Sequence, residues 1–302
     1  MSVTNDRKSG FAALIGRPNA GKSTLINQLV GQKIAIMSDK PQTTRTRIRG
    51  ILTKPEGQVV FLDTPGMHRP RHQLGQYMME IAENSIREVD VVICVTDASF
   101  GGTEKDEYVL EKIREARVPV VLVLNKVDRI ADKSKLLRLI EEYQAAYPFV
   151  EILPISAKTG EQVDLLTSIV YKLLPVGPMY YPEEAVTDHP ERFIIAELIR
   201  EKVLLLTREE IPHSVAVVIE QLELREDRDV LYINALIYTE RDSQKAILIG
   251  KNGDLLKRVG ILARRDIESL FGSKAFLELW IKVKKDWRNR EHLLRSFGYE
   301  RD

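Results

Sequence analysis

One short segment constrains the fold of this 302-residue chain more than any other. Gly16–Ser23 has the spacing GxxxxGKS and lies between an apolar run typical of a strand and an amphipathic run typical of a helix. Backbone N–H groups of such a loop point at phosphate oxygens, and the helix N-terminus adds its dipole. The pattern predicts a phosphate-binding loop, in which Lys22 reaches the outer phosphates and Ser23 offers a hydroxyl to Mg²⁺.

The residues around this loop predict an α/β domain with a parallel sheet. Short apolar runs alternate with longer amphipathic runs up to residue 174. This alternation is typical of a sheet covered by helices on both faces, in which ligands bind at the carboxyl ends of the strands. The expected strands are 11–16, 48–53, 59–63, 91–97, 118–125 and 152–156, and the expected helices are 22–30, 73–86, 104–116, 133–146 and 162–174.

A second, smaller domain of α+β class is expected after a linker. Pro175, Gly177, Pro178, Pro182 and Pro190 indicate a stiff connection. Beyond it, helical periodicity covers 191–206 and 254–271, strand alternation covers 215–222, 230–238 and 276–283, and a short helix precedes Gly250. We therefore expect a nucleotide-binding domain over 1–175, a linker over 176–190 and a second domain over 191–302.

Composition narrows the classes of protein that the chain can belong to. Hydrophobic residues make up 44% and charged residues 29%, as in ordinary globular proteins. The single cysteine, Cys94, lies in an apolar run, so we expect a buried structural thiol and a cytoplasmic location. No apolar run is long enough to span a bilayer. From residue 243 to residue 302 there are 14 Lys and Arg against 8 Asp and Glu, which indicates an anionic partner for this part.

Three further motifs follow later strands of the predicted sheet. In Asp63–Gly66, the sequence DTPG, an aspartate can hold Mg²⁺ and Gly66 can present an N–H to a γ-phosphate. In Asn125–Asp128, the sequence NKVD, the Asp128 carboxylate can accept both donors on the edge of guanine, whereas adenine lacks this pair. Ser156–Lys158 can aim a backbone N–H at the guanine O6. The order and spacing of the motifs therefore predict a guanine nucleotide site.

These motifs resemble those of the Ras-like translation-factor class of GTPases. The resemblance implies GTP or GDP with Mg²⁺ as the ligands, and a switch segment in which Thr43 or Thr44 meets Mg²⁺; we favour Thr44. It implies a second switch over 67–76. The implied metal ligands are Ser23, Thr44 and Asp63, and the implied catalytic set is Lys22, Thr44, Gly66 and Asn19. The implied nucleotide-contacting set is Gly16, Arg17, Pro18, Asn19, Ala20, Gly21, Lys22, Ser23, Thr24, Thr43, Thr44, Asp63, Thr64, Pro65, Gly66, Asn125, Lys126, Asp128, Ser156, Ala157 and Lys158.

The chain departs from Ras-type enzymes at one position that matters for hydrolysis. Such enzymes place a glutamine directly after the DxxG glycine to orient the attacking water, and Met67 stands there. We therefore expect hydrolysis to be slow or to be assisted in another way. Asn19 matches a subgroup of the class in which K⁺ binds beside the β- and γ-phosphates, and this resemblance implies K⁺-stimulated hydrolysis.

The second domain contains a glycine loop of the kind found in KH domains. Gly250–Gly253, the sequence GKNG, joins the short helix to the longer one, and basic residues follow it. Together with the βααβ order around the loop, this pattern predicts an RNA-binding KH domain of the prokaryotic type II arrangement. We expect Trp280 to lie in the core, and Trp287 to pack in the core rather than stack on a base. The expected RNA-binding residues are Ile249, Gly250, Lys251, Asn252, Gly253, Lys257, Arg258, Lys284, Lys285 and Arg288.

Over nearly its whole length, the chain resembles the Era family of bacterial GTPases. The resemblance implies binding to the 3′ end of the small-subunit (16S) ribosomal RNA and a role in maturation of the 30S subunit. It also implies a monomer with no DNA partner, and peripheral association of some members with the inner membrane. Two alternatives remain: a membrane-associated signalling GTPase that couples the cell cycle to growth, and a GTPase partner in RNA modification. The GKNG loop disfavours the first, and the lack of a second catalytic centre disfavours the other.

Overall fold

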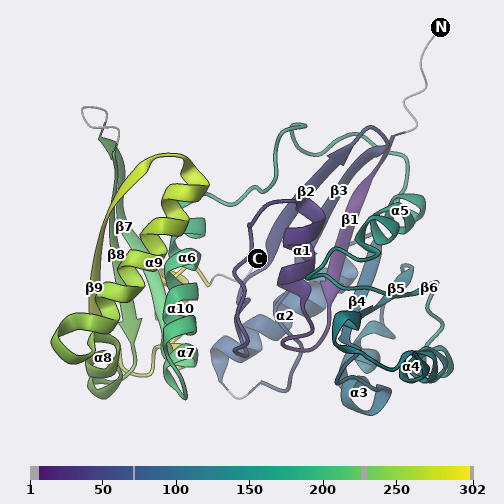
Figure 1. The fold of residues 1–302 in the computed structure, drawn as a ribbon, viewed down its shortest axis with the longest axis horizontal. Helices are drawn as coiled ribbons and strands as arrows, with labels where there is room; N and C mark the ends of the chain where they lie inside the picture. Colours follow the sequence, from purple (N-terminus) through teal and green to yellow (C-terminus); the bar gives the residue numbers. More distant parts are fainter. Residues whose placement is uncertain (1–6, 71, 226–229, 300–302) are drawn as a thin grey trace, which may run out of the picture. The chain divides into compact units, whose positions relative to one another are not determined.

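The structure is a computed structural model that describes residues 7–70, 72–225 and 230–299 (Figure 1). Residue 71 of the expected second switch, and the first residues of the expected first domain, lie outside this described part. The chain divides into two compact units, and each contains segments from distant parts of the sequence. The first comprises Met1–Ala35, Thr44–Pro70 and Met78–Asp188, and the second comprises Ile36–Thr43, Arg71–Tyr77 and His189–Asp302.

The described part of the first unit holds a six-stranded, mostly parallel sheet with the order β2-β3-β1-β4-β5-β6. Only the pairing of β2 with β3 is antiparallel. The central strands are continuous runs of Val, Ile and Leu because both of their faces are covered. The strands are β1 (Lys8–Ile15), β2 (Ile48–Lys54), β3 (Gly57–Asp63), β4 (Val91–Asp97), β5 (Val120–Asn125) and β6 (Glu151–Pro154).

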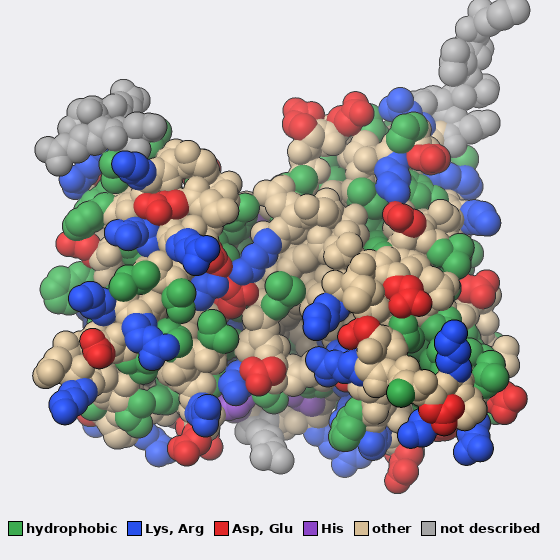
Figure 2. Space-filling view, viewed as in Figure 1, with side chains coloured by type: hydrophobic (Ala, Val, Ile, Leu, Met, Phe, Trp, Pro, Cys, Tyr) green, Lys and Arg blue, Asp and Glu red, His purple; other side chains and the backbone are tan. Residues whose placement is uncertain are grey.

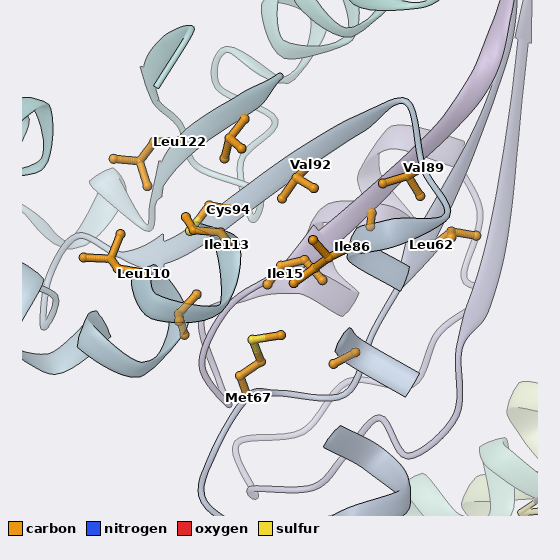
Figure 3. Packing of buried hydrophobic residues seen from close by; sticks show 14 of the residues in the cluster. Ile15, Leu62, Met67, Ile86, Val89, Val92, Cys94, Leu110, Ile113 and Leu122 are labelled. Carbon is orange, nitrogen blue, oxygen red and sulfur yellow. The ribbon is translucent and has the colours of Figure 1, made fainter. Parts of the chain in front are cut away.

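Helices pack on both faces of this sheet, as the alternating pattern predicts. Side chains of α2 and α3, such as Ile86 and Ile113, join Ile15, Cys94 and Leu122 of the strands in one buried cluster (Figure 3). Helices α1 and α5 contact each other and the strands β1 to β3. The helices are α1 (Lys22–Val30), α2 (Gln73–Arg87), α3 (Thr103–Ile113), α4 (Lys133–Ala146) and α5 (Val163–Leu173), with a short 3₁₀ turn η1 (Val127–Arg129).

The second unit has the α+β class expected for it. Its sheet has the order β7-β8-β9, in which β8 pairs antiparallel with β7 and parallel with β9. Helices α6 and α9 pack against each other, and Ile199 and Ile267 meet Ile233 of the sheet in a buried cluster. The elements are α6 (Glu191–Leu206), α7 (Ile211–Ser214), β7 (Ala216–Arg225), β8 (Val230–Thr239), α8 (Asp242–Ile249), η2 (Lys251–Gly253), α9 (Asp254–Phe271), β9 (Lys274–Val283), η3 (Trp287–Asn289) and α10 (Glu291–Ser296).

The two tryptophans differ in burial, and the expectation for one of them is wrong. Trp287 is fully buried and its indole N–H donates to the carbonyl of Ser214 at 2.8 Å, so it packs in the core as expected. Trp280 is 59% exposed instead of lying in the core. Successive strand residues point to opposite faces, and Trp280 shares its face with the exposed Phe276, whereas the buried Ile281 points to the helices. No helix in the described part of the chain is long and apolar enough to cross a membrane.

Candidate functional site

The phosphate-binding loop leaves β1 and enters α1, as the sequence predicts. Gly21 has a left-handed backbone with φ of 99°, and a Cβ atom there would lie 2.2 Å from Nδ2 of Asn125. Only glycine fits this position, because both the backbone angle and the close approach exclude a side chain. The loop is therefore packed directly against the asparagine of the NKVD motif.

Lys22 is buried at the start of α1, with its ammonium group held over the loop. Its Nζ donates to the carbonyls of Gly16 and Arg17 at 3.0 and 2.9 Å. Burial lowers the pKa of Lys22 to about 8, although the carboxylate of Asp63 acts in the opposite direction. A cation in this position can pair with phosphates that enter the loop.

Two hydroxyls and one carboxylate from three separate segments converge beside this lysine. The Ser23 hydroxyl donates to Oδ2 of Asp63 at 2.7 Å, and the Thr44 hydroxyl lies 2.8 Å from that of Ser23 and 3.2 Å from the same carboxylate oxygen. Thr43 points elsewhere, because its hydroxyl donates to the carbonyl of Lys40 at 2.6 Å. The structure thus brings Thr44, and not Thr43, to Ser23 and Asp63.

The donor set around Asp63 fits a magnesium ion. Oδ1 of Asp63 is buried without a hydrogen-bond partner in the described part of the chain, and burial raises the pKa of this carboxyl group. Hydroxyl and carboxylate oxygens are the ligands that Mg²⁺ prefers. Across the described ranges, no cluster of three His, Cys, Asp or Glu residues offers a different kind of metal site.

The NKVD and SAK segments meet at the carboxyl ends of β5 and β6. Asn125 donates from Nδ2 to the carbonyl of Ala20 at 2.9 Å and accepts the N–H of Ala157 through Oδ1 at 2.9 Å. Asp128 accepts the Ser156 hydroxyl at 2.7 Å, and its side chain is exposed. Asn125 therefore joins the loop before α1 to the SAK segment, and Asp128 remains exposed beside them.

Asp97 supports the site, although no sequence motif singles it out. Nζ of Lys126 donates to the carbonyl of Asn19 and to Oδ2 of Asp97, both at 2.6 Å. Hydrogen bonds from Lys126 and Ser99 hold the pKa of Asp97 below its usual value against the opposing effect of burial. The position of Asp97 as the last residue of β4 was an available signal, because functional side chains gather at the carboxyl ends of parallel strands.

Met67 lies in the core of the first unit. Its side chain is 2% exposed and belongs to the buried cluster with Ile15 and Cys94 (Figure 3). Its backbone N–H donates to the carbonyl of Gly16 at 3.0 Å. The residue at the position of the Ras-type glutamine thus contacts the loop through its backbone, and its side chain lies in the core.

In the second unit, a groove of about 420 Å³ runs beside the GKNG loop. Its apolar wall contains Leu256, Leu277 and Leu279, and Lys257 and Arg264 are among its lining residues. Lys and Arg side chains intermingle with hydrophobic side chains on the visible face of this unit (Figure 2). An apolar groove with basic side chains suits bases on its wall and phosphates at its edge.

The sequence motif predicts the GKNG loop but not the whole groove. Gly260 and Ile261 also line it, and they continue the spacing of Gly253, Leu256 and Lys257 along one face of α9. This helical spacing was a readable signal. Phe276 of β9 also lines the groove at its exposed side, and only the tertiary structure places it there.

The other expected RNA-contacting residues divide into exposed and paired side chains. Lys251, Asn252, Lys257, Arg258, Lys284 and Lys285 are exposed, and Ile249, Gly250 and Gly253 are half-buried. Arg288 differs, because its guanidinium forms an ion pair with Glu240 at 2.5 Å. A phosphate would therefore have to compete with a carboxylate for Arg288.

Comparison with known proteins finds a match for each half of the chain. A family described as 50S ribosome-binding GTPase matches residues 11–126, and a KH-domain family matches residues 210–288. A crystal structure of Era in complex with MgGDPNP and nucleotides 1506–1542 of 16S ribosomal RNA is 42% identical, with a TM-score of 0.95, and the match covers 98% of this chain and 100% of that one. A variant of Aquifex aeolicus Era bound to GDP·AlF₄⁻ is also 42% identical, with a TM-score of 0.94, over 97% of this chain and 100% of that one.

Proposed function

The chain belongs to the Era family, and from this premise we propose that it hydrolyses GTP, binds the 3′ end of 16S ribosomal RNA and acts in maturation of the 30S subunit. The observation that carries the proposal is the presence, in one chain, of the converging guanine-nucleotide motifs and of the groove beside the GKNG loop. We further propose the division into a GTPase domain over 1–175, a linker over 176–190 and an RNA-binding domain over 191–302.

In the first of these domains, each group has a distinct part in the reaction. Ser23, Thr44 and Asp63 would hold Mg²⁺, which when bound neutralises phosphate charge. The Lys22 ammonium and the Gly66 N–H stabilise the outer phosphates. Asp128 selects guanine through its carboxylate. Because Met67 is buried, no side chain directly after Gly66 orients water, so the intrinsic hydrolysis is slow.

RNA binding tests the whole proposal directly. A short RNA with the sequence of the 16S 3′ end is titrated into the full chain at fixed salt, with a GTP analogue and then with GDP, against a scrambled RNA. We expect sequence-dependent binding that is tighter in the GTP form, because the two ligands can be coupled only through a difference in affinity. Binding that ignores both sequence and nucleotide would contradict the proposal and would favour a membrane-associated signalling GTPase.

We expect the affinity for GDP to fall as the pH rises above about 8, the pKa to which burial lowers Lys22. Below this pH the ammonium is already charged, whereas above it the phosphates must draw a proton onto Lys22 as they bind. Calorimetry in buffers of different ionisation enthalpy measures this proton uptake. An affinity that stays constant from about pH 7 to about pH 9, with no proton taken up, would rule out the lowered pKa.

We also propose that K⁺ stimulates hydrolysis through Asn19. Its backbone is left-handed with φ of 64°, and Lys126 anchors its carbonyl. A cation beside the transferred phosphate stabilises charge that develops in the transition state. We expect turnover to be at least about fivefold faster in KCl than in NaCl, and the difference to vanish in Asn19→Asp. The exposed Asn84→Asp on α2 is the control that keeps it, and equal wild-type rates in both salts would refute the idea.

A cytoplasmic location, peripheral association with the inner membrane and a monomeric state complete the proposal. The basic surplus near the C-terminus supports attraction to anionic surfaces, whether RNA or lipid. Co-sedimentation with anionic vesicles, with and without competing RNA, separates these two partners. Light scattering during size exclusion determines whether the chain is a monomer.

A further inference from the structure

Helix α6 carries three consecutive charged residues that are all buried. Arg200, Glu201 and Lys202 are 1%, 5% and 8% exposed. Charged side chains are rarely buried unless they are paired, and replacing a buried ion pair by apolar residues is often neutral for stability. Stability of the fold therefore gives no sufficient reason for this charged triplet, and its partners within the second unit indicate another role.

Two of the three side chains bind the backbone of Ile36–Thr43, a segment that belongs to the same compact unit as α6. Arg200 donates from Nη2 to the carbonyl of Thr43, at the end of the segment. Oε1 of Glu201 accepts the N–H of Met37 at 2.9 Å, near its beginning. Hydrogen bonds from α6 thus fix the backbone of this segment near its first residue and at its last residue.

Arg200 is itself fixed on α6. Its Nε and Nη2 donate to the two carboxylate oxygens of Glu197, at 2.7 and 2.6 Å. A bidentate pair of this kind sets the plane of the guanidinium. The remaining nitrogen, Nη1, is buried with no hydrogen-bond partner among the described residues. An unsatisfied buried donor lowers stability, so this guanidinium is not placed for stability alone.

Lys202 extends the same set of contacts to α9. Its Nζ donates to Oε2 of Glu201 at 2.6 Å and to Asp266 on α9. Helix α9 also provides Leu256 and Lys257 to the groove beside the GKNG loop. A continuous line of hydrogen bonds therefore runs from α9 through Asp266, Lys202 and Glu201 to the backbone of Met37.

The held segment ends directly before Thr44, whose hydroxyl lies against Ser23 and Asp63. We propose that Arg200 and Glu201 are positioning residues: they hold Ile36–Thr43 in the backbone arrangement that delivers the Thr44 hydroxyl to the Mg²⁺ and triphosphate site, and Lys202 ties this arrangement to α9. The inference rests on the proposed function, in which Thr44 is a ligand of the Mg²⁺ that accompanies GTP and contacts the γ-phosphate that GDP lacks. These contacts with Ile36–Thr43 therefore favour binding of GTP over GDP. Thermodynamic linkage then requires a reciprocal effect: RNA bound in the α9 groove changes the affinity for GTP by the same factor by which GTP changes the affinity for RNA.

The first test removes the guanidinium without leaving a buried carboxylate unpaired. In the double variant Glu197→Gln/Arg200→Met, we expect the Kd of a Mg²⁺–GTP analogue to rise at least about fivefold while that of GDP changes less than about twofold. Glu197→Gln alone is the comparison variant, because it keeps the Arg200 guanidinium and leaves it one acceptor, so we expect the ratio of the two affinities to change less than in the double variant. A loss of packing alone would weaken both nucleotides equally.

A second pair of variants tests Glu201 and guards against a double variant that fails to fold. Glu201→Gln keeps an oxygen that accepts the N–H of Met37, whereas Glu201→Met has a similar length and no such acceptor. Both remove the charge, and Lys202 retains Asp266 as its partner. We expect the GTP-to-GDP affinity ratio to stay near that of the wild type in Glu201→Gln and to fall at least about threefold in Glu201→Met.

The outcomes separate this inference from the proposed function. The positioning role would be overturned if Glu197→Gln/Arg200→Met and Glu201→Met fold but lose the same affinity for GTP as for GDP. An unchanged GTP-to-GDP affinity ratio in both variants would overturn it as well. Binding of the 3′-end RNA is measured on the same proteins, and we expect its dependence on nucleotide to shrink with the ratio. If the wild type does not bind this RNA, the proposed function fails, but the GTP-to-GDP affinity ratio of the variants still decides the role of Arg200 and Glu201. If this ratio falls in the variants while RNA affinity still differs between the GTP and GDP forms, the link to α9 is refuted.

Discussion

Replacing Asp128 by asparagine is expected to weaken GTP and GDP binding by at least about 100-fold, or ~2.7 kcal/mol, and to raise the affinity for xanthosine diphosphate. The carboxylate accepts two donors of guanine, whereas the amide of asparagine offers one acceptor and one donor. Xanthine carries an oxygen where guanine carries the exocyclic amine, so the amide matches it. Competition binding with guanosine, xanthosine and adenosine diphosphates measures the change in specificity.

The matched control is Glu141→Gln, which removes one negative charge from an exposed position on α4. It is expected to leave all three affinities within about twofold, because exposed charges at a distance are screened by salt. If Asp128→Asn lowered guanosine and xanthosine affinities alike, the carboxylate would be supporting the local structure through Ser156 rather than reading the base.

Replacing Gly253 by aspartate is expected to weaken binding of the 3′-end RNA at least about tenfold while nucleotide binding is unchanged. Gly253 lines the groove and has a left-handed backbone with φ of 79°. An added Cβ meets no heavy atom within 4 Å, and aspartate tolerates this backbone region better than most residues. The carboxylate would then repel phosphates at the GKNG loop without disturbing the packing.

Gly272→Asp provides a control at the other end of the same helix. Gly272 has φ of 70° and equally open space for a Cβ atom, so both variants carry the same charge and the same backbone strain. Fluorescence anisotropy with labelled RNA is expected to detect the loss only in Gly253→Asp. Wild-type affinity in both variants would place the RNA away from the GKNG loop, and an equal loss in both would indicate a general effect of charge.

Much of the nucleotide site could be predicted from sequence because its parts are local. Parallel strands present their carboxyl ends at one edge of the sheet, so motifs that follow β1, β3, β5 and β6 are brought together by the fold class alone. The hydrogen bonds of Asn125 to Ala20 and Ala157 show the result. Asp97 escaped notice because a lone aspartate at a strand end carries no motif, although its position was informative.

Loops and sheet faces were harder to predict. The polar segment around Thr43 and Thr44 has no helical or strand period, so nothing in its pattern decides which hydroxyl faces Asp63. Strand alternation separates the two faces of β9 but does not say which one the helices cover. For this reason Trp280 was expected in the core, although it is 59% exposed.

The sequence by itself determined the class of each domain, the order of the elements and the guanine nucleotide motifs, because periodicity and short-range spacing encode these features. Only the tertiary structure decided that Thr44 joins Ser23 and Asp63, that α9 and β9 together line a groove, and that Arg200, Glu201 and Lys202 are buried. Charged side chains such as these three are mostly exposed in proteins. Their burial depends on partners far away in the sequence, such as Asp266, and local pattern contains no information about such partners.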